Sequence, residues 1–241
     1  MSEKVAYAGR DLEAMSFAIN YHRWILQIFE PYLGTRIVEV GAGTGSFSEL
    51  VLERKPESLS LVEPSEKMYK MLNERVERLG SPTQIKTYNT VFGNVAEQLK
   101  AAQRPDSVIY VNVLEHILDD QAELATVHRT VSSGGRVLIF VPALSWLYGN
   151  LDEHIGHHRR YTKPELEGKC HRAGFSIVEC RYFDLAGIVP WWIKYRLFKS
   201  STMEAQTVKA YDKFVVPATR AIESIIRPPI GKNLLLIAEK S

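Results

Sequence analysis

Three glycines alternate with small residues directly after a short β-rich run. The run Arg36–Val40 is followed at once by the glycine loop, Gly41-Ala42-Gly43-Thr44-Gly45, and an amphipathic segment covers residues 45–55. Glycine lets the backbone turn sharply and approach a ligand closely, and the first turn of a helix offers unpaired N–H groups to an anion. A strand, a glycine loop and a helix in this order are typical of folds that bind nucleotides at the carboxyl edge of a parallel sheet.

The rest of the chain continues this alternation of short apolar runs and amphipathic segments. Further strands are predicted at residues 58–63, 84–88, 107–111, 136–141, 175–182 and 233–239. Helices are predicted at residues 11–33, 45–55, 65–79, 93–102, 118–131 and 163–173. Strands that alternate with helices form βαβ units with right-handed crossovers. The pattern therefore predicts an α/β fold around a mostly parallel sheet.

Composition excludes several classes of protein. Of the 241 residues, 45 % are apolar and 24 % are charged, as in ordinary globular proteins. The two cysteines, Cys170 and Cys180, are too few for a disulfide scaffold. A net charge of +2 lacks the clear basic excess that DNA-binding proteins need for phosphate contacts, and it also disfavours an RNA acceptor. No stretch resembles a signal peptide or a membrane span, so we expect a cytoplasmic protein.

The acid that ends the second predicted strand narrows the choice of ligand. Glu63 stands 18 residues after Gly45, where a carboxylate can accept hydrogen bonds from both ribose hydroxyls. The loop and the acid suit either NAD(P) or S-adenosylmethionine. Dinucleotide binders favour Gly-x-Gly-x-x-Gly, whereas this loop is Gly-x-Gly-x-Gly, with Glu39 two residues before its first glycine. The spacing therefore favours S-adenosylmethionine, and an NAD(P)-dependent oxidoreductase remains the alternative.

This form of the loop resembles motif I of the class I S-adenosylmethionine-dependent methyltransferases. Gly93-Asn94-Val95 and Val113-Leu114-Glu115-His116, after the third and fourth predicted strands, resemble two further motifs of that family. The Asn20-Tyr21-x-x-Trp24 segment, residues 156–162 and Pro228-Pro229-x-Gly231 resemble the bacterial type 11/12 group. Members of that group methylate small metabolites and glycan or lipid precursors.

The resemblance implies a Rossmann-like fold with a mostly parallel seven-stranded sheet, helices on both faces and a helical insertion before the last strand. We expect a single methyltransferase domain in four parts. They are an N-terminal helical cap (1–34), a cofactor-binding core (35–184), a helical insertion or lid (185–230) and the last strand (231–241).

The resemblance also assigns the cofactor, S-adenosylmethionine, with S-adenosylhomocysteine as its product. The glycine loop would line the methionine end and Glu63 would hold the ribose. Asn94 replaces the commoner aspartate near the adenine. The full expected cofactor site is Tyr21, Glu39, Gly41, Ala42, Gly43, Gly45, Glu63, Pro64, Ser65, Met68, Asn94, Val95 and Asn112.

A histidine- and arginine-rich segment, residues 151–162, follows the fifth predicted strand. A neutral histidine can take a proton from an acceptor hydroxyl or amine, and an arginine can bind a phosphate or carboxylate. Neighbouring residues of an extended loop point in different directions. We therefore expect only one of each adjacent His and Arg pair to face the acceptor. The candidate catalytic residues are His116, His157 and His158. The candidate acceptor-binding residues are His154, Arg159, Arg160, Tyr161, Trp191 and Trp192.

A metal-assisted mechanism is the alternative to a histidine base. Glu115, His116 and His157 resemble the metal site of small-RNA 2′-O-methyltransferases. Those sites carry a further glutamate where this chain has Asn112. We therefore favour a histidine base over a divalent metal ion.

The predicted insertion is basic and aromatic. Between residues 190 and 230, seven Lys and Arg face three Asp and Glu. Three interpretations stay open: a lid over an apolar or lipid-linked acceptor, a peripheral contact with an anionic membrane, and an ordinary covering helix. The sequence thus predicts methyl transfer, most simply to oxygen, on a small-molecule or lipid- or glycan-precursor acceptor. It leaves the oligomeric state open.

Overall fold

The computed structural model describes residues 18–241. The predicted N-terminal helix at 11–33 is therefore covered only in part, and residues 11–17 lie outside the described residues. Its described part is the helix α2 (Ile19–Phe29), which continues into a 3-10 turn at Glu30–Tyr32.

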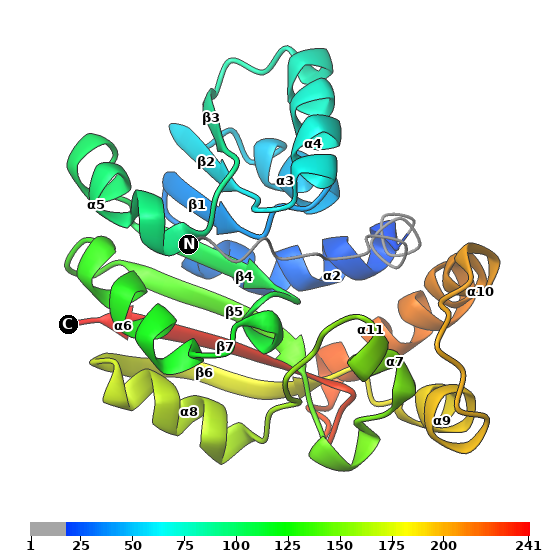
Figure 1. The fold of residues 1–241 in the computed structure, drawn as a ribbon. Helices are drawn as coiled ribbons and strands as arrows, with labels where there is room; N and C mark the ends of the chain where they lie inside the picture. Colours follow the sequence, from blue (N-terminus) through cyan, green and yellow to red (C-terminus); the bar gives the residue numbers. More distant parts are fainter. Residues whose placement is uncertain (1–17) are drawn as a thin grey trace.

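Seven strands form one sheet in the order β3-β2-β1-β4-β5-β7-β6 (Figure 1). The strands are β1 (Arg36–Val40), β2 (Ser58–Val62), β3 (Gln84–Tyr88), β4 (Ser107–Val111), β5 (Arg136–Pro142), β6 (Phe175–Phe183) and β7 (Asn233–Lys240). Every neighbouring pair is parallel except those of β7, which runs antiparallel to both β5 and β6. The predicted mostly parallel seven-stranded sheet is confirmed.

Helices cover both faces of the sheet because successive strand residues point to opposite sides. Val38 and Tyr110 belong to the core on one side, under α5 (Phe92–Ala102), α6 (Asp120–Thr130) and α8 (Lys163–Arg172). Ile37 and Ile109 belong to the core on the other side. That side is covered by α2, α3 (Ser46–Leu52), α4 (Glu66–Leu79) and α11 (Val216–Ile225).

The order of the strands creates a crevice at the carboxyl ends of β1 and β4. The chain leaves β1 toward β2 and β3 and then returns to β4 on the other side of β1. The connections after β1 and β4 therefore diverge, and ligands of such sheets bind at this point.

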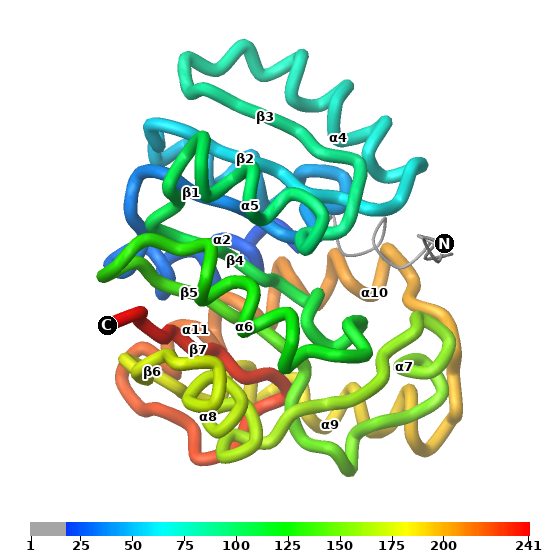
Figure 2. The backbone as a smooth tube through the Cα atoms, turned by 60° about the vertical axis from the view of Figure 1, so that its left-hand side comes forward, coloured from blue at the N-terminus to red at the C-terminus, as the bar shows by residue number. Residues whose placement is uncertain are grey.

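The remaining helices lie beyond the carboxyl ends of the parallel strands (Figures 1 and 2). They are α7 (Asn150–His154), α9 (Ile188–Trp191) and α10 (Ala205–Ala210). A π-helical turn, Trp192–Leu197, continues α9, and a second, Tyr211–Val215, joins α10 to α11. The expected helical insertion before the last strand is thus present.

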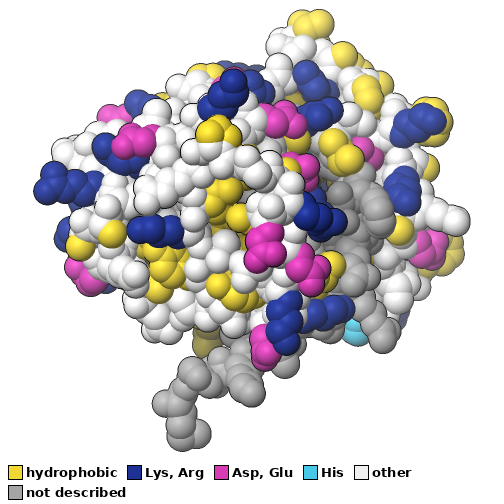
Figure 3. Space-filling view, turned by 90° about the horizontal axis from the view of Figure 1, so that it is seen from above, with side chains coloured by type: hydrophobic (Ala, Val, Ile, Leu, Met, Phe, Trp, Pro, Cys, Tyr) yellow, Lys and Arg dark blue, Asp and Glu magenta, His cyan; other side chains and the backbone are white. Residues whose placement is uncertain are grey.

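Helix length and surface charge bear on how the protein could meet a membrane. Among residues 18–241, no helix is both long enough and apolar enough to span a bilayer. Figure 3 views the molecule from the side of β3 and α4, where basic and acidic side chains are interspersed. The charge on this face is therefore of mixed sign.

Candidate functional site

The glycine loop makes a turn that side chains would obstruct. Gly41, Gly43 and Gly45 have φ angles of +69°, +57° and +81°, in the left-handed region. A Cβ atom on Gly41 would lie 2.4 Å from a methyl carbon of Val113. The Gly41 N–H also donates to the Val62 carbonyl (2.7 Å), which closes the turn against β2.

Glu63 lies against the glycine loop, as expected from its place after β2. Its carboxylate accepts hydrogen bonds from the N–H groups of Gly43 (2.8 Å) and Ser65 (2.8 Å). Burial raises the pKa of Glu63, although these two backbone donors oppose the shift. The Asn89 amide holds the Glu63 carbonyl (2.9 Å), so the acid has a fixed position beside the loop.

Glu39 supplies an unpartnered acceptor in the same place. Its side chain is buried, and its Oε2 atom has no hydrogen-bond partner among the described residues. Burial raises the pKa of Glu39 to about 8. A buried polar atom without a partner is costly, so this oxygen fits a ligand that brings a donor, such as an ammonium group.

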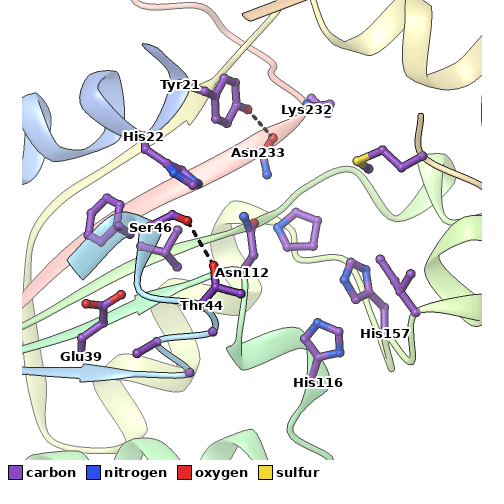
Figure 4. Close-up of a pocket in the computed structure, with 18 of the residues that line it drawn as sticks. Tyr21, His22, Glu39, Thr44, Ser46, Asn112, His116, His157, Lys232 and Asn233 are labelled. Atoms are coloured by element: carbon purple, nitrogen blue, oxygen red, sulfur yellow. Dashed lines mark hydrogen bonds between the residues drawn. The ribbon is translucent and has the colours of Figure 1, made fainter. Parts of the chain in front are cut away.

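A cavity of about 140 Å³ opens at the crevice between β1 and β4. Figure 4 shows Glu39 and Thr44 on one side of it and His116 and His157 on the other, with Asn112 between them. The structure brings ten of the expected site residues to its wall: Tyr21, Glu39, Gly41, Ala42, Gly43, Asn112, His116, His157, Arg160 and Trp191. The expected methionine end of the cofactor site and part of the expected acceptor site therefore share one cavity.

The residues expected around the adenine lie next to this cavity rather than in its wall. Pro64 and Asn94 are exposed, Val95 is largely buried and Met68 is fully buried. Ser65 begins α4, where its hydroxyl accepts from the Met68 N–H (3.4 Å). They follow the ends of β2 and β3, and their contact with the adenine stays a prediction.

Asn112 adopts a backbone conformation that most residues avoid. Its φ angle is +54°, in the left-handed region that asparagine tolerates better than other side chains. Its N–H donates to the Phe140 carbonyl (2.8 Å), which pins the end of β4 to β5. Such strain is often found at functional sites, and here it lies at the cavity wall.

His157 is oriented by a buried carboxylate. Its Nδ1 atom lies 2.8 Å from Oδ1 of Asp152, which also accepts from Nε of Arg160 (2.9 Å). Burial alone would raise the pKa of Asp152, but the hydrogen bond from His157 and the charge of Arg160 hold it below its usual value. Asp152 is therefore ionised, and it favours the tautomer of His157 with the proton on Nδ1.

Two further polar groups lie beside His157. The His116 ring packs edge-on against the His157 ring, with the centroids 4.6 Å apart, and burial lowers the pKa of His116 to about 3. Glu115 is fully buried, and burial raises its pKa to about 7. Its Oε1 lies 3.7 Å from Nε2 of His157, and neither of its carboxylate oxygens has a hydrogen-bond partner among the described residues.

The structure does not bring the other expected acceptor-binding residues to the cavity. Arg159 pairs with Asp120 (2.6 Å) and donates to the Leu118 carbonyl (2.8 Å). Tyr161 is fully buried, and its hydroxyl donates to Asp120 (2.7 Å). Both side chains tie the segment to α6. The remaining two, His154 and Trp192, are exposed and outside the cavity wall. The same holds for His158, so the structure does not bring this candidate catalytic residue to the cavity.

Sequence reasoning missed several residues of the site, and three of them bear on its chemistry. Asp152 orients His157, and Lys232 and Asn233 line the cavity next to Tyr21. The Tyr21 hydroxyl contacts Asn233 (3.0 Å, Figure 4) and Asp184 (3.0 Å). Asp152 precedes His157 by five residues, but only the turn of α7 brings them together. Lys232 and Asn233 reach the site because β7 runs antiparallel.

The comparisons with solved structures show the fold. A methyltransferase from Mesorhizobium loti is 19 % identical, with a TM-score of 0.56 over 89 % of this chain and 95 % of that chain. The methyltransferase domain of a bacterial protein, CtHen1-C, is 13 % identical, with a TM-score of 0.62 over 93 % and 99 %. A mycolic acid cyclopropane synthase in complex with SAH and CTAB is 13 % identical, with a TM-score of 0.58 over 86 % and 79 %.

The family is shown by the sequence. A family model described as a methyltransferase domain matches residues 11–180, which is more than half of the chain. No curated protein sequence matches the chain significantly. The matched region holds the glycine loop, Glu63 and the two cavity histidines, His116 and His157. It also holds Glu39, whose unpartnered oxygen fits a ligand that carries a hydrogen-bond donor. The chain therefore belongs to the methyltransferase-domain family and is an S-adenosylmethionine-dependent methyltransferase.

Proposed function

We propose that the chain methylates an oxygen atom of a small-molecule or lipid- or glycan-precursor acceptor, with His157 as the general base. The observation that carries this proposal is the Asp152–His157 pair at the wall of the cofactor cavity. Bound S-adenosylmethionine supplies a methyl group that is already activated. The protein's own contribution is therefore alignment, exclusion of water and removal of one proton.

The pair has the geometry that a base requires. With its Nδ1 proton donated to Asp152, His157 presents Nε2 as the proton acceptor. Asp152 then stabilises the imidazolium that forms, as the acid does in other His–Asp pairs. His116, whose pKa is lowered to about 3, stays neutral and contributes no competing charge.

The test compares two adjacent histidines. The purified protein is incubated with methyl-labelled S-adenosylmethionine and an extract of the source cells, and the label is partitioned between organic and aqueous phases. We expect His157→Ala to lower incorporation by about 100-fold to 10,000-fold without changing the affinity for S-adenosylhomocysteine. His158→Ala, at an exposed position, is the matched control and should retain activity. Equal incorporation by His157→Ala would exclude it as the base.

One observation favours a second candidate, metal-assisted methyl transfer. Ligand atoms of Glu115, His116 and His157 lie within 4.8 Å of one another. Both Glu115 oxygens are buried without a hydrogen-bond partner among the described residues, and Asp152 holds the far nitrogen of His157, as carboxylates do behind metal-bound histidines. These three residues would hold a divalent ion, which lowers the pKa of a bound hydroxyl.

Cobalt binding separates the two candidates. Chelator-treated protein is titrated with Co²⁺ while its visible absorption is followed, and methyl transfer is measured with and without the ion. Metal-assisted transfer predicts a saturating absorption band that Glu115→Gln abolishes, together with activity that returns on adding metal. Full activity after chelation and no absorption band would leave the histidine base alone.

We also infer that the insertion contacts an anionic membrane surface, which would suit a lipid-linked acceptor. Leu197 and Phe198 are 56 % and 73 % exposed, and the basic side chains of Arg196 and Lys199 flank them. Basic residues next to exposed apolar residues favour an anionic bilayer surface.

A further inference from the structure

A second cavity continues the cofactor cavity into the helical insertion. Four residues line both cavities, at a boundary that we name the junction: Tyr21, Trp191, Met203 and Lys232. Beyond the junction, most of the wall is apolar or aromatic and includes Pro190, Tyr195, Val208, Tyr211 and Val216. A molecule placed at the junction can thus reach the catalytic side with one end and the apolar cavity with the other.

The junction gathers three hydrogen-bond donors, of which the Trp191 Nε1–H is buried and lacks an acceptor among the described residues. The Lys232 ammonium lies over the Trp191 ring, 5.2 Å from its centroid, and the Arg160 guanidinium lies 4.7 Å from the centroid of the same ring. Three kinds of N–H donor therefore meet around one indole ring.

The nearby carboxylates are already engaged elsewhere. Asp184 accepts from Lys232 (3.0 Å), from the Tyr21 hydroxyl (3.0 Å) and from the Gly187 N–H (3.0 Å). Asp212, the acid in the wall of the second cavity, accepts from the N–H groups of Asn20 and Tyr21. Neither acid satisfies Trp191, and Lys232 has three N–H donors for the single carboxylate that it contacts among residues 18–241.

We propose that the junction binds an oxyanion of the methyl acceptor, a carboxylate or a phosphate, and that the second cavity holds an apolar body attached to it. This inference rests on the proposed methyl transfer and names the acceptor's chemical class. Charge-assisted hydrogen bonds from Lys232 and Arg160 bind such a group, and its oxygens satisfy the Trp191 N–H. The apolar walls exclude water from the rest of the molecule.

The cofactor's own carboxylate has the same chemistry and could occupy the junction instead. Binding experiments on the intact protein distinguish the two sources. Calorimetry measures the affinity of S-adenosylhomocysteine for the free protein. It then measures the affinity of decyl phosphate, decanoate and the uncharged decyl glucoside for protein saturated with S-adenosylhomocysteine. None of these measurements requires turnover.

We expect decyl phosphate and decanoate to bind at least about tenfold more tightly than decyl glucoside. Lys232→Met should remove about tenfold of the affinity for the anionic probes and leave decyl glucoside and S-adenosylhomocysteine unchanged. Trp191→Phe, which keeps a ring but removes the N–H, should weaken the anionic probes severalfold. Lys213→Met changes an exposed lysine outside both cavities and is the matched control.

Two outcomes would overturn the proposal. Equal binding of anionic and uncharged probes to the wild-type protein would show that the junction does not select an anion. A loss of S-adenosylhomocysteine affinity in Lys232→Met would assign the junction to the cofactor's carboxylate. If the protein binds the anionic probes as expected but catalyses no methyl transfer to oxygen, that result would refute only the proposed function, because the probes report binding alone.

Discussion

Glu39 lies in the wall of the cofactor cavity, 3 % exposed, with one carboxylate oxygen unpartnered among the described residues. Burial raises its pKa from 4.5 to about 8. The folded protein therefore keeps a proton on Glu39 that the unfolded chain releases above pH 4.5. Because the folded state binds more protons in this window, the free energy of unfolding falls as the pH rises from 4.5 to about 8.

Replacing Glu39 by Gln removes this titration. We expect Glu39→Gln and the wild type to show the same pH dependence below pH 4.5. Above it the variant should gain stability relative to the wild type, by at most about 1.4 kcal/mol for each unit of the pKa shift. Urea unfolding at several pH values measures the difference, and Glu97→Gln, at an exposed position, is the control. Parallel stability curves for the variant and the wild type would contradict the assignment.

At the scale of elements, α2 depends on the insertion for its first turn. Its N-cap residue, Ala18, has no side chain that can accept a hydrogen bond. Asp212, from the π-helical turn before α11, accepts instead from the N–H groups of Asn20 (3.0 Å) and Tyr21 (2.8 Å). A carboxylate at the start of a helix satisfies free N–H groups and interacts favourably with the helix dipole. One contact thus fixes the insertion and Tyr21 together.

Removing the carboxylate tests this coupling. We expect Asp212→Ala to lower the free energy of unfolding by about 1–2 kcal/mol, as the loss of a helix cap does. It should also weaken S-adenosylhomocysteine binding, because Tyr21 lines the cavity. Asp212→Asn keeps an acceptor and should lose less. Urea unfolding and calorimetry measure both effects. Unchanged affinity for S-adenosylhomocysteine in a destabilised Asp212→Ala would show that the cap serves stability alone.

The elements also show how far the sequence reaches. β1 and β4 have their predicted bounds because strands buried on both faces read as short apolar runs, and the partly exposed edge strand β3 also has its predicted bounds. The direction of β7 depends on how the insertion returns the chain to the sheet, which no local pattern encodes. Alternation in an extended loop predicts that one of His157 and His158 faces inward. Only the fold of α7, which places Asp152, selects His157.

At the scale of the whole molecule, apolar exposure is concentrated in the insertion. Most of the exposed large hydrophobic side chains belong to it: Leu185, Val189, Trp192, Ile193, Leu197, Phe198, Phe214, Ile222, Ile225, Ile226 and Ile230. Of its three acids, Asp212 and Glu223 are buried, where they accept backbone hydrogen bonds, and Glu204 is exposed. Its surface charge is therefore more basic than its composition indicates.

This distribution makes the proposed membrane contact testable by sedimentation with vesicles. We expect the protein to sediment with phosphatidylglycerol vesicles at roughly 0.1 M salt and to be released at about 1 M, where the screening length falls to about 3 Å. Phosphatidylcholine vesicles should not retain it, because they lack the anionic charge. Phe198→Ser should weaken the binding. Leu118→Ser is the matched control, since Leu118 is 74 % exposed but lies outside the insertion. Binding that Leu118→Ser weakens as much as Phe198→Ser would assign the contact to general apolar exposure and not to the insertion.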